Sequence, residues 1–345
     1  MKNKATSFDI AHMAGVSQST VSRALNDSPL VNIETRRKVQ EIARQLNYKV
    51  DKNASNLRRQ RSSTIALLLF EDPTSDDSMI NPFFLSMLGS ITKASASRGY
   101  DLLVSFQNLD SDWHAEFEDS HKADGIILLG YGDYRSYEGK LTQLQEQGTH
   151  IMRWGAPVAE YPGISIGCDN FQGGKDVTEH VLSLRQGNFA FIGDVGDKAP
   201  EFQARYEGYL RALEQHSETA VASVQIDAIS AESAGIDAAQ QLLERQGPLP
   251  DAIVCAADII AVGVLKTLKA AGVQVPADVA VVGFDNIQLS AFTTPSLTTV
   301  QQNTIQAGEA LVENLLRAIE GEQTTDYLMP ATLIVRQSCG CESNE

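Results

Sequence analysis

Residues 16–26, VSQSTVSRALN, contain many short hydrogen-bonding side chains and have the length of a short helix. The apolar positions that would pack inward are Val21, Ala24 and Leu25. The side chains left on the outer face are Gln18, Ser19, Ser22 and Arg23. Hydroxyls and an amide can reach base edges in the major groove, and Arg can pair with guanine or phosphate. Ser17 and Thr20 suit phosphate contacts and capping, so the segment predicts a DNA-reading helix.

Two further helices would position this segment. Thr6 and Asp9 fit a T-x-x-D capping box that begins a first helix near residue 7. Gly15 suits a left-handed residue after that helix, and Ser17 suits the N-cap of the DNA-reading helix. Asn32 can cap a third helix, whose apolar positions are Val39, Ile42, Ala43 and Leu46. A helix, a short turn with glycine and a second helix form a helix-turn-helix.

The charge of the chain is unevenly distributed. Residues 1–61 carry 12 Lys and Arg against 5 Asp and Glu, whereas residues 62–345 carry 16 against 39. A small basic head on an acidic body indicates that the head meets a polyanion. No apolar run approaches the roughly 18 residues of a membrane helix, and the N-terminus lacks the apolar stretch of a secretory signal. We therefore expect a cytoplasmic protein without a membrane segment.

From residue 63 onward, short apolar runs alternate with helical stretches. The expected strands are STIALLLF (63–70), YDLLVSF (100–106), ADGIILLG (123–130), THIMRW (149–154), GISIGC, NFAFIG, ASVQID, DAIVCAAD and VAVVGFD. The expected helices cover 83–97, 138–147, 170–184, 201–215, 232–244 and 259–271. This alternation predicts parallel sheets covered on both faces, with about ten strands divided between two halves. Ligands bind beyond the carboxyl ends of such strands, so a cleft between the halves is expected.

The motifs TSFDIAHMAGVSQSTVSRALN and VNIETRRKVQEIARQLNY resemble the LacI/GalR family of bacterial transcription repressors, and the resemblance continues through the chain. It implies a small all-α helix-turn-helix domain joined by a hinge helix to a two-subdomain α/β body like the type I periplasmic binding proteins. The implied domains are residues 1–48, a hinge at 49–62 and a body at 63–345. Within the body, one subdomain would take about 63–164 and 294–325, and the other about 165–293 and 326–345.

The segment KVDKNASNLRRQR (49–61) is polar and basic around one apolar residue, Leu57. A helix this short is marginal alone in water. The resemblance implies a hinge helix that folds on operator DNA, with Leu57 wedged into the minor groove and Ala54 facing the second hinge helix of a dimer. The DNA contacts implied for head and hinge are Thr6, Ser17, Gln18, Ser19, Thr20, Ser22, Arg23, Asn26, Asn53, Ala54, Leu57, Arg58 and Arg59.

The resemblance also implies an effector site at strand ends in the body. The resemblance and the positions at strand ends indicate seven effector-binding residues, which are Phe83, Phe84, Trp154, Asp169, Glu201, Arg205 and Asp285. Aromatic faces can stack on a sugar or a purine, and Arg offers a planar fork for vicinal hydroxyls or a carboxylate. Asp169 is either an effector ligand or a helix N-cap. Ala257 and Ser230 depart from the family pattern, since an Asn and often an aromatic residue stand there in relatives.

These features predict a homodimeric repressor of carbohydrate-utilisation genes, released from a palindromic operator by a mono- or disaccharide. A purine effector, a protein corepressor and a cytosolic sugar-binding module without DNA function stay open as alternatives, as does the sign of the effector's action. Neither G-x-S-x-G nor H-E-x-x-H occurs, and the six His share no metal-ligand spacing, so no enzyme, cofactor or metal is expected. Cys339 and Cys341 are expected to be exposed, reduced thiols without a role.

Overall fold

A computed structural model describes residues 5–48, 61–70, 80–107, 111–130, 134–157, 161–196, 199–216 and 222–341 of the chain. It divides into two units, Met1–Ser62 and Ser63–Glu345. The expected hinge contacts lie outside the described residues; they are Asn53, Ala54, Leu57, Arg58 and Arg59.

The first unit holds three short helices around a small apolar core, as predicted. They are α1 (Ser7–Ala14), α2 (Gln18–Leu25) and α3 (Ile33–Gln45). Thr6 and Asp9 form the capping box of α1, and Gly15 ends that helix at φ 68°. Ser17 caps α2 and Asn32 caps α3 through side-chain oxygens, which satisfy N–H groups that the first helical turn leaves free. The core residues are Ile10, Ala11, Ala14, Val21, Ala24, Val31, Val39, Ile42 and Ala43.

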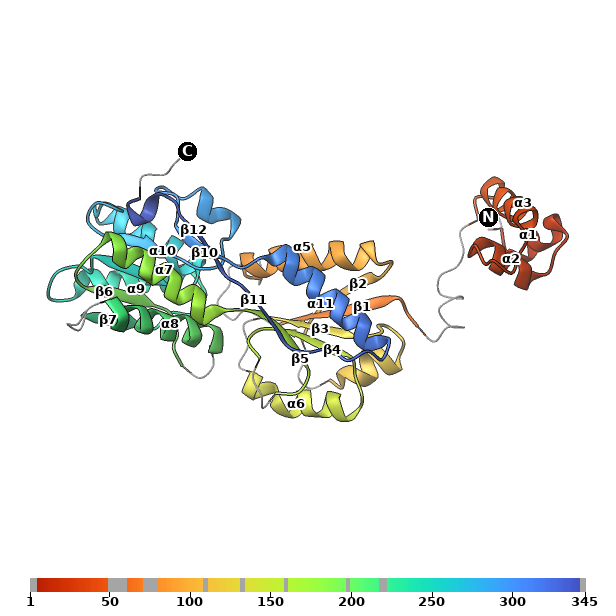
Figure 1. The fold of residues 1–345 in the computed structure, drawn as a ribbon, viewed down its shortest axis with the longest axis horizontal. Coiled ribbons are helices and arrows are strands. Elements are labelled where there is room, and N and C mark those ends of the chain that lie inside the picture. The colour runs from red at the N-terminus through yellow and green to blue at the C-terminus, as the bar shows by residue number, and fades with distance from the viewer. Residues whose placement is uncertain are drawn as a thin grey trace. The chain divides into compact units, whose positions relative to one another are not determined.

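The first half of the second unit is a six-stranded parallel sheet in the order β11-β5-β4-β3-β1-β2. Its strands are β1 (Thr64–Leu69), β2 (Asp101–Phe106), β3 (Ile126–Leu129), β4 (Ile151–Trp154), β5 (Ile164–Cys168) and β11 (Tyr327–Met329). Its helices are α5 (Pro82–Ser97), the π-helical turn η1 (His114–Asp119), α6 (Tyr134–Glu146) and α11 (Thr304–Ile319). In Figure 1, α5 and α11 lie on one side of this sheet and α6 on the other.

Alternate residues of β1 serve the two faces of this sheet. Ile65, Leu67 and Leu69 join the core under α5 and α11, whereas Ala66 and Leu68 join the core on the opposite face. A strand buried on both sides reads as a continuous apolar run, which is why TIALLL lacks the polar alternation of a half-exposed strand.

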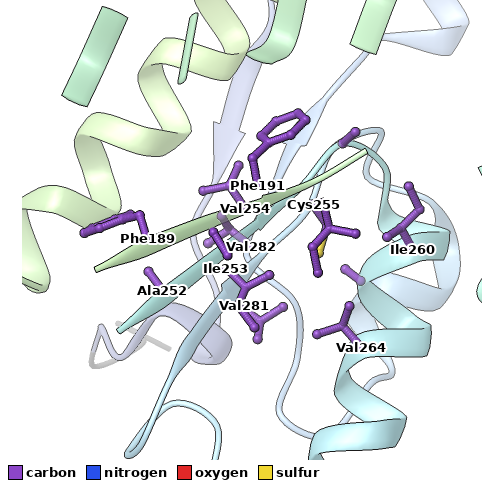
Figure 2. Close-up of a cluster of buried hydrophobic side chains, with 14 of the residues drawn as sticks. Phe189, Phe191, Ala252, Ile253, Val254, Cys255, Ile260, Val264, Val281 and Val282 are labelled. Atoms are coloured by element: carbon purple, nitrogen blue, oxygen red, sulfur yellow. The ribbon is translucent and has the colours of Figure 1, made fainter. Parts of the chain in front are cut away.

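The second half is a four-stranded parallel sheet in the order β7-β6-β8-β9. Its strands are β6 (Phe189–Ile192), β7 (Ser223–Ile226), β8 (Ala252–Cys255) and β9 (Ala280–Val282). Its helices are α7 (Asn170–Leu184), α8 (Pro200–His216), α9 (Glu232–Glu244) and α10 (Asp258–Ala270). Figure 2 shows part of its core, where side chains from β6, β8 and β9 pack with Ile260 and Val264 of α10.

Three stretches carry the chain between the halves. β5 belongs to the first sheet and α7 packs in the second core, so the first passage follows Cys168. β10 (Thr299–Gln301) pairs antiparallel with β12 (Thr332–Ile334), and α11 packs on the first half, which places the second passage near residue 302. The third lies between β11 and β12. β5 pairs as far as Cys168, β10 as far as Gln301 and β11 as far as Met329, so the chain leaves each sheet only after these residues.

The predicted fold class is confirmed, and nine of the described strands coincide with the expected apolar runs. The short strands β10, β11 and β12 and the helix α11 were not predicted. β10, β11 and β12 have three residues each, which carry little periodicity, whereas the equally short β9 lies within the longer apolar run VAVVGFD. Among the described residues, no helix combines the length and apolarity needed to cross a membrane.

Candidate functional site

The start of α2 carries a connected group of hydroxyls. Ser17 Oγ accepts from the backbone N–H of Thr20 at 3.1 Å and lies 2.8 Å from both Ser19 Oγ and Thr20 Oγ1. Ser17 and Ser19 are exposed, and Thr20 is half-buried. These hydroxyls surround the positive end of a helix dipole, an arrangement suited to phosphate oxygens.

Gln18 is held in place by the neighbouring helix. Its Nε2 donates to Ser7 Oγ at 2.7 Å, and both side chains are half-buried. This bond uses one amide hydrogen, so the second hydrogen and the carbonyl oxygen keep a fixed orientation. A Gln with one donor and one acceptor in a fixed plane matches the N6 and N7 edge of adenine.

The remaining expected head residues have different surroundings. Ser22, Arg23 and Asn26 are exposed, and Asn26 Nδ2 donates to the carbonyl of Ser22 at 2.9 Å. Thr6 is occupied by capping, because its N–H and its hydroxyl both donate to Asp9 Oδ2 at 2.8 Å. These two bonds lower the pKa of the Asp9 carboxyl.

In the body, Arg205 on α8 is the centre of a buried polar cluster. Its Nε donates to Asn170 Oδ1 at 2.8 Å, and its Nη1 donates to the carbonyl of Ala256 at 2.5 Å. Nη1 also lies 3.3 Å from Asp285 Oδ1, with both side chains only 1% exposed. The guanidinium carbon stacks 3.8 Å from the ring centroid of Phe284. A charged group at this depth is costly unless it is paired and hydrogen-bonded, and Asn170, Ala256 and Asp285 provide such partners.

Asp285 reaches this position through an unusual backbone conformation. It follows β9 with φ 111°, and Asn286 follows at φ 52°. For a residue other than glycine, a positive φ carries a strain energy of order 1–3 kcal/mol, and such residues are frequent at functional sites. Gln302 Nε2 donates to Asp285 Oδ1 at 2.6 Å, and the Asp285 N–H donates to the carbonyl of Val300. The strand β10 therefore supports the strained turn.

Asp258 supports the same turn from the start of α10. Its Oδ1 accepts from Thr299 Oγ1 at 2.5 Å, and its Oδ2 accepts from the N–H of Ile287 at 2.9 Å. Burial, and then the nearby charge of Asp285, raise the pKa of Asp258 well above its usual value. A Cβ at Gly283 would lie 2.2 Å from Asp258 Oδ1, so only glycine fits beside the carboxyl group.

Residues beyond the strand ends of the two sheets contact each other. Asn81, after β1, donates from Nδ2 to Ser230 Oγ, after β7, at 2.8 Å. Glu201, after β6, is buried, and burial raises the pKa of its carboxyl. Its own backbone N–H, the charge of Arg205 and the N–H of Ala156, after β4, oppose that rise. The carboxyl ends of both sheets thus meet, where the fold class places ligands.

Three expected aromatic residues gather on the first half at this meeting point. Phe83 and Phe84 open α5, and Trp154 ends β4; all three are at most 5% exposed. The ring centroids of Phe83 and Trp154 are 5.9 Å apart, and those of Phe83 and Phe84 are 5.3 Å apart with edge contact. Asn81 caps the helix that carries both Phe residues. All three aromatics belong to the core of the first half.

Comparison with known proteins identifies the family. Residues 8–51 match the bacterial regulatory proteins of the lacI family, and residues 178–339 match the periplasmic binding protein-like domain. The probable HTH-type transcriptional repressor ExuR of Bacillus subtilis (strain 168) is 31% identical over 317 residues, 92% of either chain. The chain belongs to the lacI family. The ribose operon repressor of Escherichia coli (strain K12) is 30% identical over 321 residues, 91% of this chain and 93% of the relative.

The structural comparison agrees with this membership. The lac repressor dimer bound to operator and the anti-inducer ONPF has a TM-score of 0.80 at 22% identity, covering 98% of this chain and 99% of that one. The likeness extends over head and body together and shows the fold. This LacI-family protein is accordingly a transcriptional repressor with a periplasmic-binding-protein-like body.

Of the expected body residues in this LacI-family chain, Glu201, Arg205 and Asp285 share one cluster. Asp169 is the N-cap of α7, accepting from the N–H of Gln172 at 2.9 Å, which is the second of its two expected roles. Sequence reasoning missed three members of the cluster, which are Asn170, Asp258 and Gln302. A polar residue two or three positions after the end of an apolar strand was the available signal for the first two. Ala257 leaves α10 without a side-chain cap.

Proposed function

We propose that this protein binds a palindromic operator as a homodimer and represses carbohydrate-utilisation genes until a small sugar binds between the two halves of its body. The proposed regions are a DNA-binding head at residues 1–48, a hinge at 49–62 and a body at 63–345. The observation that carries the proposal is the Arg205–Asp285 cluster at the meeting carboxyl ends of the two sheets.

The exposed face of α2 supports DNA reading by the head. Ser19, Ser22 and Arg23 are exposed, and Gln18 is oriented by Ser7. None of these side chains is needed in the core of the head, which is built from the opposite face. Short donors on a preorganised helix suit base contacts, while the hydroxyl group at Ser17 suits phosphate.

The body supports a sugar as the effector. A sugar ring has apolar C–H faces and a rim of hydroxyls. The aromatic residues on the first half match the faces, and the carboxylates, amides and guanidinium on the second half match the rim. The ribose operon repressor is named for a sugar operon, which agrees with this class of effector.

A homodimer is supported by β2, which forms an edge of the first sheet in the part of the chain that the structure describes. β2 is an edge strand, and Leu103, Val104 and Phe106 on it are between 38% and 43% exposed. Leu85 on α5 is also exposed. An apolar edge strand left open is an aggregation hazard, whereas pairing with a second copy would cover it. One head reads only a half-site, and a two-fold operator needs two.

Repression and release follow from linkage between the two sites. An effector that prefers one arrangement of the body halves shifts the protein toward that arrangement. If that arrangement separates the hinges, the effector weakens DNA binding, and DNA weakens effector binding by the same factor. No step requires catalysis.

The test is fluorescence anisotropy of labelled DNA from upstream of the protein's own gene, at fixed salt, with mono- and disaccharides and purines added in turn. Salt is fixed because phosphate contacts shift affinity by roughly 10³–10⁵ between 50 and 200 mM. We expect tight binding that one sugar releases. Release by a purine alone would overturn the sugar assignment. Tightening by a sugar would overturn induction, and the absence of sequence-specific binding would overturn the proposal.

A matched pair of head variants locates the DNA-reading face. Arg23→Ala should lower specific binding and relax base preference if the side chain reads a base, or lower affinity uniformly if it grips phosphate. Arg44→Ala is the control, because Arg44 is exposed on α3 and pairs with Glu41 at 3.1 Å. Equal effects of both changes would contradict the assignment of α2.

A further inference from the structure

Three side chains of types that can bind metals lie close together in the second half of the body, away from the Arg205 cluster. His180 on α7 and Cys339 and Cys341 near the end of the chain have ligand atoms that all lie within 4.8 Å of one another. Cys341 Sγ is 3.7 Å from His180 Nε2. The sequence predicted exposed thiols here, but Cys339 is fully buried. The C-terminal segment folds back onto the second half, which brings two cysteines to a histidine about 160 residues earlier.

The separation of Cys341 and His180 is compatible with tetrahedral coordination. With zinc–sulfur bonds of about 2.3 Å and zinc–nitrogen bonds of about 2.0–2.1 Å, tetrahedral ligands lie roughly 3.5–3.8 Å apart. The 3.7 Å between Cys341 and His180 falls in that range. Gly340, between the cysteines, adopts φ 93°, a left-handed conformation that turns the chain so that both thiols approach one histidine.

The two other cysteines provide a contrast within the same chain. Cys168 and Cys255 are buried in the cores of the first and second halves, and neither belongs to a cluster of metal-binding groups among the described residues. Burial raises the pKa of Cys168 to about 12. A thiol kept protonated by its apolar surroundings is a poor metal ligand, because thiolate is the form that binds metals.

We propose that His180, Cys339 and Cys341 form a binding site for a thiophilic divalent metal ion of the zinc class, with a fourth position left to water or an external ligand. Binding exchanges the thiol protons for metal–sulfur bonds and changes no oxidation state. The ion would join the C-terminal segment to α7. Ser338 already ties that segment to the second sheet, since its Oγ accepts from the N–H of Thr298 at 2.8 Å and donates to the carbonyl of Val281 at 2.5 Å.

Cobalt(II) is the probe, added to the full-length reduced protein, because thiolate coordination gives it a ligand-to-metal charge-transfer band in the near ultraviolet. We expect one equivalent of cobalt to develop the band, and zinc to displace cobalt and abolish it. Zinc should also raise the thermal midpoint of the protein, because a ligand that binds the folded state more tightly than the unfolded state stabilises it.

Variants assign the ligands. Cys341→Ser and His180→Gln change half-buried side chains and should each weaken cobalt binding at least tenfold, whereas the buried Cys339 is left intact. Cys255→Ala and His216→Gln, outside the cluster, are the matched controls and should retain the band. A wild-type protein without the band would overturn the proposal. So would a band that persists unchanged in Cys341→Ser and His180→Gln, or one lost equally in the controls.

Discussion

The two halves of the body share a doubly wound design and differ at the carboxyl ends of their strands. The first half presents Phe83, Phe84 and Trp154, which also belong to its core. The second half presents Arg205 and Asp285 in a buried network of hydrogen bonds. The aromatic side of the site is thus continuous with an apolar core, whereas the polar side consists of buried charged side chains.

The two halves therefore relate binding to stability in different ways. Aromatic residues are held by packing, so a change there costs the apolar contacts that it removes. A buried ion pair is held by its partner, so a change in one member leaves the other charged and desolvated. We therefore expect the polar side to respond more sharply than the aromatic side.

The largest effect is expected for Asp285→Asn. The change is nearly isosteric but leaves Arg205 buried without its carboxylate, and breaking such a pair costs about 3–5 kcal/mol. Chemical denaturation should show this loss in the free energy of unfolding, and sugar titration should show lost release from DNA. Asn keeps an oxygen that can accept from Gln302 Nε2, so the variant removes the charge and keeps this hydrogen bond.

Glu232→Gln is the control for Asp285→Asn. Glu232 pairs with Lys266 at 2.9 Å, but both side chains are exposed, and exposed pairs contribute about 0–1 kcal/mol. The control should unfold like wild type and respond to sugar normally. If Asp285→Asn were as mild as Glu232→Gln, the polar side would not depend on its ion pair.

A smaller effect is expected for Trp154→Phe on the aromatic side. Truncation of a core Trp to Ala costs roughly 3–5 kcal/mol, and retention of a ring should limit the loss to about 1–2 kcal/mol. Because the smaller ring covers less of a sugar face, the effector concentration for half-release should also rise.

Trp113→Phe is the matched control for Trp154→Phe. Trp113 is as fully buried, but it lies in the core on the opposite face of the same sheet. Both variants should lose similar stability, and only Trp154→Phe should shift the sugar response. Equal shifts in the two variants would mean that Trp154 acts through packing alone.

Features that depend on residues close together in the sequence were predictable, and features that depend on distant residues were not. The caps of α1, α2 and α3 join residues three positions apart, so the residue types alone indicated them. Strands buried on both faces were equally predictable, because each is a continuous apolar run in the sequence. In contrast, Gln302, after β10, and Asp258, at the start of α10, both contact the turn after β9, and their proximity depends on strand order.

Contacts between distant segments account for two features that the sequence did not indicate. β5 pairs with both β4 and β11, a partner about 160 residues away, so the first passage between the halves follows Cys168. Cys339 was expected on the surface as part of a polar tail, but Ser338 and Cys339 are buried against the second half. Both depend on contacts between distant segments, which periodicity does not report.

A modest effect is expected for Ser230→Ala, which tests the contact between the halves. The change removes the acceptor for Asn81 Nδ2 at 2.8 Å, and a neutral hydrogen bond contributes about 0.5–1.5 kcal/mol. Loss of a contact that joins the halves should change sugar affinity by up to about tenfold, measured by titration calorimetry. Ser86→Ala removes an exposed hydroxyl bonded within α5 and should leave sugar affinity unchanged.

The smallest expected effect is a pH dependence at Glu201, which lies between the two sides. Burial raises the pKa of its carboxyl above the ordinary value of 4.5, although Arg205 and Arg153 offset part of that rise. In the pH range between the unfolded and folded pKa, the folded state keeps a proton that the unfolded state has lost. Stability therefore falls as pH rises through this range, and below pH 4.5 the penalty disappears.

Glu201→Gln should remove this penalty, because the amide stays neutral and its oxygen can still accept from the N–H of Ala156. The variant should gain stability relative to wild type at pH 8 and lose that advantage near pH 4, measured by urea denaturation at both values. Glu207→Gln, exposed on the same helix, is the matched control and should show no such difference. An advantage that grew toward acid would mean that the ionised Glu201 stabilises the fold, and the carboxyl would then belong with the ion pair of the polar side.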